Sequence, residues 1–162
     1  MIKALAFLLA MTGAAHASAW EEFQRRCLVP MADFSVPDLS GLIVTTKTDG
    51  KNYPYYMEVT FGYYQEGDPK GLDAFLIVIT HDFDRIDQCQ LIVRSGNVDQ
   101  LVVNARAGLQ GVDLPFVQIG EHNGLEHWHS DDWREPILSV GFGTSPKMGG
   151  FMLLALETDL ES

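Results

Sequence analysis

Basic residues are scarce in this chain, which has 11 Lys and Arg residues against 22 Asp and Glu residues and a net charge of −11. A protein that binds nucleic acid neutralises phosphate groups with clustered Lys and Arg side chains. The composition therefore excludes nucleic acid as a partner. We interpret the acidic excess first as a well-hydrated surface that keeps the protein soluble. Attraction of a cationic partner or of divalent cations is the alternative interpretation.

Recognisable catalytic motifs are also missing. The chain contains no G-x-S-x-G and no H-E-x-x-H pattern, and its glycine-rich segment GFGTSPKMGG lacks the G-K-[ST] ending of a phosphate-binding loop. We therefore predict a small binding or interaction protein, of accessory, inhibitor or sensor type, rather than an enzyme. Its partner would be a protein or a small-molecule ligand outside the cytoplasm.

Long apolar runs are absent except at the beginning of the chain. There, a short positive start, the run ALAFLLAM and the small residues AHA are typical of a secretory signal peptide. We predict a signal peptide over residues 1–17, with cleavage after Ala19 as the alternative. No later segment is long enough to span a membrane. The sequence thus predicts an exported protein, and it does not distinguish the periplasm from secretion into the medium.

Cysteine is limited to two residues, Cys27 and Cys89. In an exported protein an even number of cysteines predicts a disulfide bond, and two cysteines allow one intramolecular pairing. Closing a loop of roughly 60 residues should stabilise the fold by about 4 kcal/mol. A reactive thiol or a metal-binding pair is the alternative, but the chain has no C-x-x-C spacing to support it.

The pattern along the chain predicts one α+β domain over residues 18–162, with an antiparallel β-sheet, an N-terminal helix and a central helix. Ser18 and Glu21 have the spacing of a capping box at the start of the first helix, and Pro30 is expected to end it. The central helix is predicted over residues 97–109, with Asn97 or Ser95 as its N-cap and Gly108 at its exit. Apolar runs and alternating patterns predict strands in most of the remaining chain.

Three histidines fall within the segment GEHNGLEHWHSDDW, between residues 122 and 129. Asn123-Gly124 is a strong signal for a two-residue hairpin turn, because both positions require positive φ. The predicted cross-strand pairs are His122 with Leu125, Glu121 with Glu126, Gly120 with His127, Ile119 with Trp128, and Gln118 with His129. Since side chains alternate along a strand, all three imidazoles should lie on one face of this hairpin.

Three interpretations of this histidine face remain open. The histidines are exposed or contact a partner, or they bind a metal ion, or they act as a metal-free acid and base. In the second case His122, His127 and His129, with Asp131 nearby, would bind zinc or copper. The corresponding alternative function is a metal-binding protein or a zinc-dependent hydrolase. No other cofactor is expected.

Tyrosines are concentrated in the segment YPYYMEVTFGYY. Along this strand, Tyr56 and Tyr64 occupy alternate positions whose side chains face away from the expected core. Exposed tyrosines often anchor protein interfaces, so these two residues form a candidate contact surface. A helix packed over them would instead make them part of the core.

Overall fold

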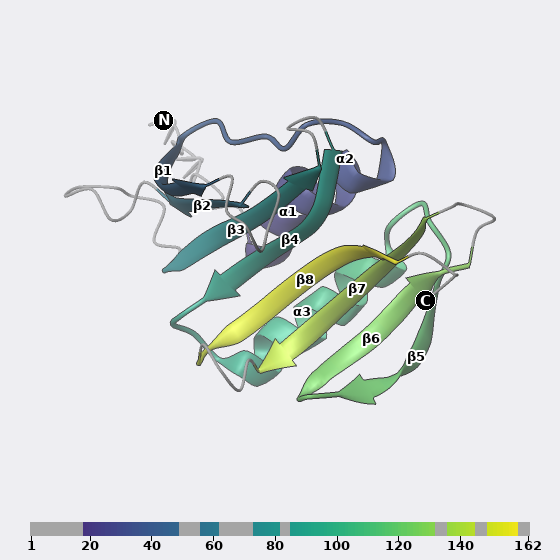
Figure 1. Ribbon diagram of the computed structural model, residues 1–162. Coiled ribbons are helices and arrows are strands. Elements are labelled where there is room, and N and C mark those ends of the chain that lie inside the picture. Colours follow the sequence, from purple (N-terminus) through teal and green to yellow (C-terminus); the bar gives the residue numbers. More distant parts are fainter. Residues whose placement is uncertain are drawn as a thin grey trace, which may run out of the picture.

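The computed structural model describes residues 18–48, 56–61, 73–81, 85–131, 136–144 and 149–158 (Figure 1). The predicted signal peptide lies outside these residues. The helical elements are α1 (Ala19–Phe23), the π-helical turn η1 (Gln24–Leu28), α2 (Val29–Ala32) and α3 (Val98–Gln110). The strands are β1 (Leu42–Thr48), β2 (Tyr56–Phe61), β3 (Ala74–His81), β4 (Arg85–Val93), β5 (Phe116–His122), β6 (Leu125–Ser130), β7 (Ile137–Thr144) and β8 (Phe151–Thr158).

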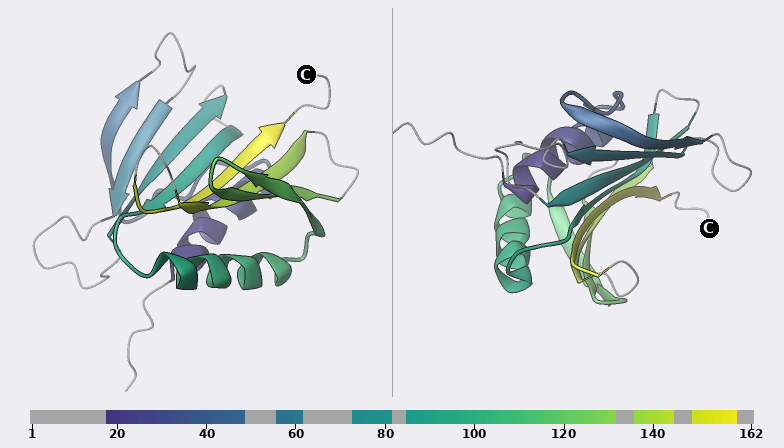
Figure 2. Two further views of the ribbon diagram at one scale, coloured as in Figure 1. Left: turned by 90° about the horizontal axis from the view of Figure 1, so that it is seen from below. Right: turned by 90° about the vertical axis from the view of Figure 1, so that its left-hand side faces the viewer.

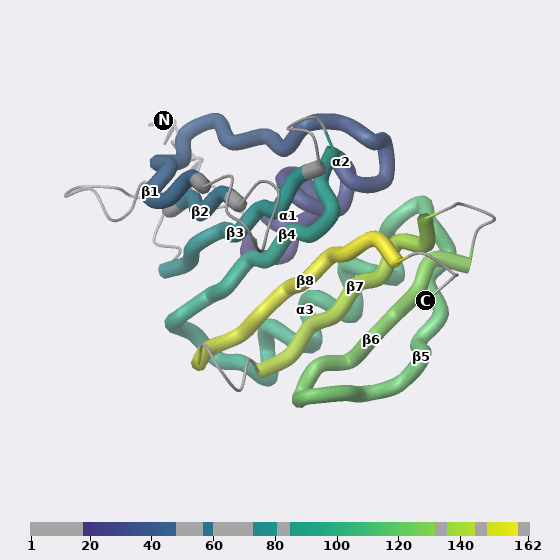
Figure 3. Tube along the Cα trace, viewed as in Figure 1, coloured from purple at the N-terminus to yellow at the C-terminus, as the bar shows by residue number. Residues whose placement is uncertain are grey.

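The strands form one eight-stranded antiparallel sheet with the order β1-β2-β3-β4-β8-β7-β6-β5. Each half of the sheet is a run of sequential neighbours. Helix α3 carries the chain from β4 to the far edge at β5, and β8 returns to pair with β4 (Figure 3). The predicted α+β class, with an N-terminal helix and a central helix, is therefore confirmed in outline, although the sheet dominates the fold.

The N-terminal helix and α3 lie on the same face of the sheet (Figure 2). The main core fills the space between them and that face, and its largest fully buried apolar side chains include Phe23, Phe142, Phe151, Leu76 and Leu91. In the described part of the chain no helix covers the opposite face. Its centre is nevertheless buried, with Phe75, Ile79, Ile92 and Leu154 exposed by 9% or less.

The first helix begins with the predicted capping box. The Ser18 hydroxyl accepts a hydrogen bond from the Glu21 backbone N–H at 3.2 Å, and the Glu21 carboxylate accepts one from the Ser18 backbone N–H at 2.6 Å. The prediction that Pro30 ends this helix is wrong, because α2 continues to Ala32. The π-helical turn η1 ends at Leu28, two residues before Pro30. Its wider backbone spacing gives room to the proline ring, which in a regular helix clashes with the carbonyl four residues earlier.

Helix α3 starts as predicted, with the Asn97 side chain accepting a hydrogen bond from the Gln100 backbone N–H at 3.1 Å. The placement of Gly108 at the exit is wrong, because the helix continues to Gln110 and its C-cap is Gly111. Gly108 lies inside the helix against the indole of Trp20 on α1, so a glycine is required there by packing and not by chain reversal. No described helix is long and apolar enough to cross a membrane.

Substitution of Gly108 by alanine is expected to destabilise the protein by about 1 to 3 kcal/mol. In most helix interiors this change stabilises by about 1 kcal/mol. Here the added Cβ would lie 2.2 Å from Nε1 of Trp20. Urea denaturation followed by circular dichroism measures the change. The penalty should be smaller when Gly108→Ala is introduced into Trp20→Phe, and a stabilising Gly108→Ala would contradict this packing.

The predicted disulfide bond is present between Cys27 on η1 and Cys89 on β4, with Cα atoms 5.5 Å apart. Both cysteines are fully buried in the core. The bond therefore joins the N-terminal helix to the middle of the sheet. Disulfides of this kind persist in oxidising compartments.

Candidate functional site

The hairpin between β5 and β6 turns at Asn123 and Gly124, which have φ values of 53° and 78°. Near the turn its register is the predicted one, with His122 opposite Leu125, Glu121 opposite Glu126, and Gly120 opposite His127. The Asn-Gly signal therefore places the histidines as expected in this part of the hairpin.

Further from the turn, the predicted pairs of Ile119 with Trp128 and Gln118 with His129 are wrong. A β-bulge at Ile119 shifts the register, so that Gln118 pairs with Trp128 and Val117 pairs with His129. Gly120 adopts a φ of 147° beside the bulge, a conformation that side chains rarely adopt. Val117 consequently lies on the same face as His129, and it is 48% exposed.

The register places the three imidazoles on one face of the hairpin, turned away from α3. Its opposite face points to the helix, because Trp128 packs against the core and Glu126 forms an ion pair with Arg106 of α3. The ring centroids of His122 and His127 are 6.4 Å apart. These two rings line a hollow of about 290 Å³, the histidine hollow, together with Ile119, Gly120 and Glu121.

His129 does not line the histidine hollow. Asp131 follows β6, and its backbone N–H donates a hydrogen bond to the Pro115 carbonyl at 2.7 Å. Across the described ranges, no three His, Cys, Asp or Glu side chains are placed together so that they could hold one metal ion. The hairpin thus gathers two of the predicted ligands. Metal binding through it stays a prediction.

The facing glutamates of the hairpin have different surroundings. Glu126 is paired with Arg106, and this contact raises the pKa of Arg106 above its usual value. Glu121 lies on the exposed edge strand. The like-charge pair expected from the sequence is therefore relieved by a helix residue that the hairpin pattern does not reveal.

The predicted tyrosine surface falls largely outside the described residues. The backbone of Tyr56 pairs with Ile79 in the sheet. Its side chain and the whole of Tyr64 are not among the described parts. The proposed role of these two residues in contacts stays a prediction.

A hollow of about 370 Å³, the Trp128 hollow, lies where the end of α3 meets the hairpin. It is lined by Leu109, Gln110, Val112, Asp113, Leu114, Pro115, Phe116 and Trp128. Trp128 stacks on Phe142 in the core, with ring centroids 6.4 Å apart. Its indole Nε1 is buried and has no hydrogen-bond acceptor among the described residues. Buried indole N–H groups usually have one, so a residue that lines this hollow carries an unsatisfied donor.

A second hollow of about 350 Å³, the Val29 hollow, lies between the N-terminal helix and the same loop. It is lined by Gln24, Leu28, Val29, Ala32 and Asp33 from the helix side and by Val112, Asp113 and Leu114 from the loop. The two hollows share the loop 112–114 as a common wall. The sequence pattern did not indicate either hollow, because each lining combines residues from different secondary-structure elements and the loop between them.

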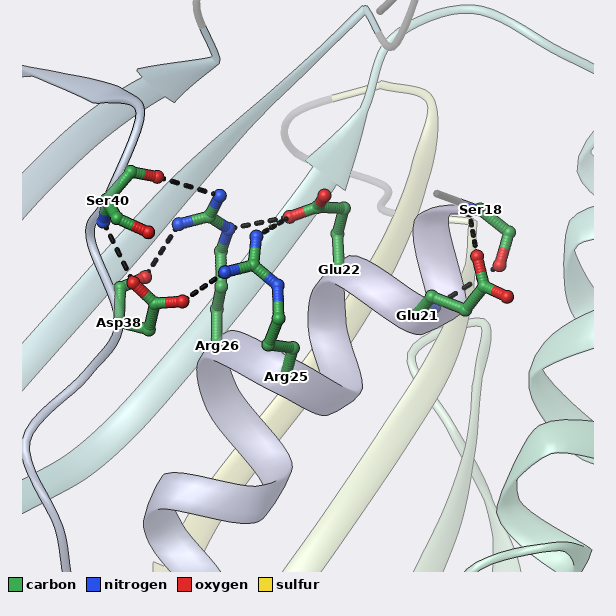
Figure 4. Close-up of polar contacts among 7 residues, drawn as sticks. All are labelled: Ser18, Glu21, Glu22, Arg25, Arg26, Asp38 and Ser40. Carbon is green, nitrogen blue, oxygen red and sulfur yellow. Dashed lines mark hydrogen bonds and ion pairs between the residues drawn. The ribbon is translucent and has the colours of Figure 1, made fainter. Parts of the chain in front are cut away.

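The helix wall of the Val29 hollow is fixed by a buried ion pair. Arg26 is 1% exposed, and its Nε donates to Glu22 at 2.6 Å. Its two terminal nitrogens donate to the backbone carbonyls of Asp38 and Ser40 at 2.7 and 3.0 Å (Figure 4). Arg25 bridges Glu22 and the Asp38 carboxylate on the exposed side. These contacts join the helix to the segment that leads into β1.

Acid is expected to weaken this connection through Asp38. Hydrogen bonds from the side chain and backbone N–H of Ser40 lower the pKa of the Asp38 carboxyl, and the charges of Arg25 and Arg26 add to the effect. Because the folded pKa lies below the unfolded value of about 3.9, ionised Asp38 stabilises the fold above that value. This contribution is lost as the pH falls through the folded pKa.

Urea unfolding between pH 2 and pH 6 tests this expectation. Asp38→Asn should reduce the loss of stability below pH 4 relative to the unmodified protein, since the titrating group is gone. Ser40→Ala should show part of the same effect. An acid dependence that is identical in Asp38→Asn and the unmodified protein would contradict the assignment.

Comparison with protein-family models, with curated proteins and with solved structures found no match to this chain. The candidate site consists of a hollow lined by Trp128, whose buried indole N–H has no acceptor among the described residues, a second hollow behind the same loop, and a hairpin face with two neighbouring imidazoles.

Proposed function

We propose that this protein is a binding domain, of accessory, inhibitor or sensor type, whose ligand occupies the Trp128 hollow. The carrying observation is the buried indole N–H of Trp128, which has no acceptor among the described residues, in a side chain that lines a hollow of about 370 Å³. Ligand sites are commonly apolar concavities with a few polar groups that fix orientation. A buried donor without a partner costs about 1 to 3 kcal/mol, and a ligand oxygen that reached the indole N–H through a small shift of the ring would remove that cost.

A fragment screen followed by NMR tests the proposal. Small neutral amides, alcohols and carboxylic acids are titrated into ¹⁵N-labelled protein, and the indole N–H resonance of Trp128 is assigned by its loss in Trp128→Phe. Fragments with a neutral oxygen acceptor should shift this resonance and the backbone amides of residues 109–116. The Trp20 indole serves as the internal control. If no fragment affects the Trp128 resonance, the proposed binding site is wrong.

We also propose that the protein works outside the cytoplasm, in the periplasm or after secretion. The Cys27–Cys89 bond supports an oxidising compartment. The capping box supports cleavage after Ala17, because Ser18 would then remain as the N-cap with its new amino group beside the Glu21 carboxylate. Cleavage after Ala19 would remove this cap. Mass determination of the exported chain distinguishes the two sites.

Metal binding at the histidine hollow is a second candidate function. The observation in its favour is the 6.4 Å separation of the His122 and His127 ring centroids across the hairpin. Modest rotations of the two rings would bring their nitrogens toward one zinc or copper ion, which imidazoles bind at about 2.0 to 2.1 Å. A hydrolase would further require an open position on that ion. Chelator-sensitive cleavage of ester, phosphate or peptide substrates would favour it.

The metal candidate predicts that untagged protein retains about one zinc or copper ion per chain after dialysis against the metal salt. His127→Ala should abolish this retention, because it removes the ring at the centre of the histidine face. His129→Ala reports whether the third imidazole joins the ion. Elemental analysis by mass spectrometry gives the stoichiometry, and retention that survives His127→Ala would exclude this site.

A further inference from the structure

We propose that the Trp128 hollow and the Val29 hollow together bind one extended, positively charged segment of a partner protein, with an apolar side chain in each hollow. This inference rests on the proposed binding function and names its class of ligand. It depends on the shared loop, the unpaired polar groups around it and the charge of the lining.

The first observation is the adjacency of the hollows. They have similar volumes, about 370 and 350 Å³, and only the loop 112–114 separates them. Each has apolar walls, from Leu109 and Phe116 on one side and from Leu28 and Val29 on the other. Val29 is 44% exposed, which leaves surface for a contact. A single chain crossing the loop would reach both hollows.

The second observation is the polar backbone between them. The loop is fixed at its ends, because the Val112 N–H donates to the Leu109 carbonyl at 3.3 Å and the Pro115 carbonyl accepts from Asp131 at 2.7 Å. Within the described residues, the backbone N–H groups of Asp113 and Leu114 donate no hydrogen bond to the protein. An extended peptide carries alternating donors and acceptors that match such a loop.

The third observation is charge. Asp33 lines one hollow and Asp113 lines both, whereas none of the described lining residues is Lys, Arg or His. Neither aspartate forms an ion pair with the described parts of the protein. The C-terminal end of α3, which carries a negative partial charge, lies at the same place. Complementarity therefore favours a Lys or Arg on the partner segment.

The acidic lining also determines which kind of ligand oxygen can accept a hydrogen bond from the Trp128 indole. The acidic surroundings disfavour a carboxylate on the ligand, so the oxygen that meets the indole N–H should be neutral. A backbone carbonyl of the bound segment has this property and comes with every residue of a peptide. The indole N–H, the loop and the two aspartates thus fit one ligand, a basic and apolar peptide.

Blocked peptides are the probes for the test. Each is acetylated and amidated and contains two leucines separated by one to three residues, of which one is lysine. Matched peptides carry glutamate in place of lysine, or serine in place of the leucines. Titration into ¹⁵N-labelled protein follows the Trp128 indole resonance, and calorimetry gives Kd. At least one lysine peptide should bind about tenfold more tightly than its glutamate counterpart, with an affinity that falls as salt is raised.

Protein variants locate the contact. Trp128→Phe should weaken the best lysine peptide about fivefold, the effect of one hydrogen bond. Asp113→Asn should weaken it about threefold and reduce its salt dependence. Val29→Ser should weaken it about fivefold through lost apolar contact. Val103→Ser is the matched control, because Val103 is a similarly exposed helical valine at 52% but does not line either hollow. Thermal unfolding verifies that each variant is folded.

Equal binding of the lysine and glutamate peptides would overturn the inference. So would a concentration-dependent mass in light scattering that Val29→Ser lowers, since a second copy of the chain would then occupy the groove. If neutral fragments shift the Trp128 resonance and no peptide does, this inference fails while the proposed small-ligand binding stands. If neither affects that resonance, both fail.

Discussion

Arg26→Ala is expected to lower the free energy of unfolding by about 3 to 5 kcal/mol, the usual cost of removing one partner from a buried ion pair. Glu22 is 6% exposed and would keep its charge with only Arg25 to balance it. The carbonyls of Asp38 and Ser40 would also lose their donors (Figure 4). Together these losses should release the segment that leads into β1 from the N-terminal helix.

Arg25→Ala is the matched control for this substitution. The two arginines are adjacent, and both contact Glu22. The Arg25 side chain is 44% exposed, however, and exposed ion pairs contribute about 0 to 1 kcal/mol. Urea denaturation of the two variants at neutral pH measures the difference. If Arg25→Ala and Arg26→Ala lowered the free energy of unfolding equally, burial would not determine how much the Arg26 ion pair contributes to stability.

Removal of the disulfide bond is expected to destabilise the protein by about 4 kcal/mol. The cysteines are 62 residues apart in sequence, and opening a loop of this length increases the conformational freedom of the unfolded chain by about that amount. Cys27→Ala combined with Cys89→Ala tests the expectation without leaving a free thiol. Because both side chains are fully buried, a small loss of packing adds to the effect.

Reduction of the unmodified protein with dithiothreitol provides an independent measurement of the same bond. Denaturation midpoints of the reduced protein and the double variant should agree within the small packing contribution. The double variant under oxidising and reducing conditions serves as a control for general effects of the reductant, because it has no disulfide bond to reduce. If neither reduction nor the double substitution changed the denaturation midpoint, the bond would not restrict the conformational freedom of the unfolded chain as expected.

The local features of the fold could be predicted because each depends on neighbours in sequence. Ser18 and Glu21 form a capping box in one turn of backbone, and Asn123 and Gly124 adopt positive φ by their own conformational preferences. The disulfide followed from the number of cysteines alone. The three cross-strand pairs nearest to the Asn123-Gly124 turn could be predicted from the position of that turn.

Features that depend on distant packing were predicted wrongly or not at all. Gly120 is compatible with either a regular strand or a bulge, and only the pairing of β5 with β6 selects the bulge at Ile119. The sequence around Gly108 is compatible both with a glycine at the end of a helix and with a glycine inside a helix that packs against an indole ring. Pro30 normally ends a helix, but the continuation here is held by Cys27 in the core and by Arg26.

The candidate site shows the same division. The histidines could be assigned to one face from alternation, yet their separation and the position of His129 required the register of β5, β6 and β7. The Trp128 hollow could not be found from the pattern, because α3, the following loop and the hairpin each supply part of its lining. Alternation along β6 places Trp128 on the face opposite to the histidines, which agrees with the packing of its ring against the core but does not reveal its unsatisfied N–H.

Four properties could be derived from the residues alone: the acidic character, the covalent bond between two distant segments, the α+β content and the sharp turn beside His122. Packing of the elements against one another was needed for the strand order, the bulge, the continuation of the first helix past Pro30 and the two hollows behind residues 112–114. The physical reason is the range of the interactions. Caps and turns form within a few residues, whereas strand order, register and hollows arise from contacts between separate secondary-structure elements.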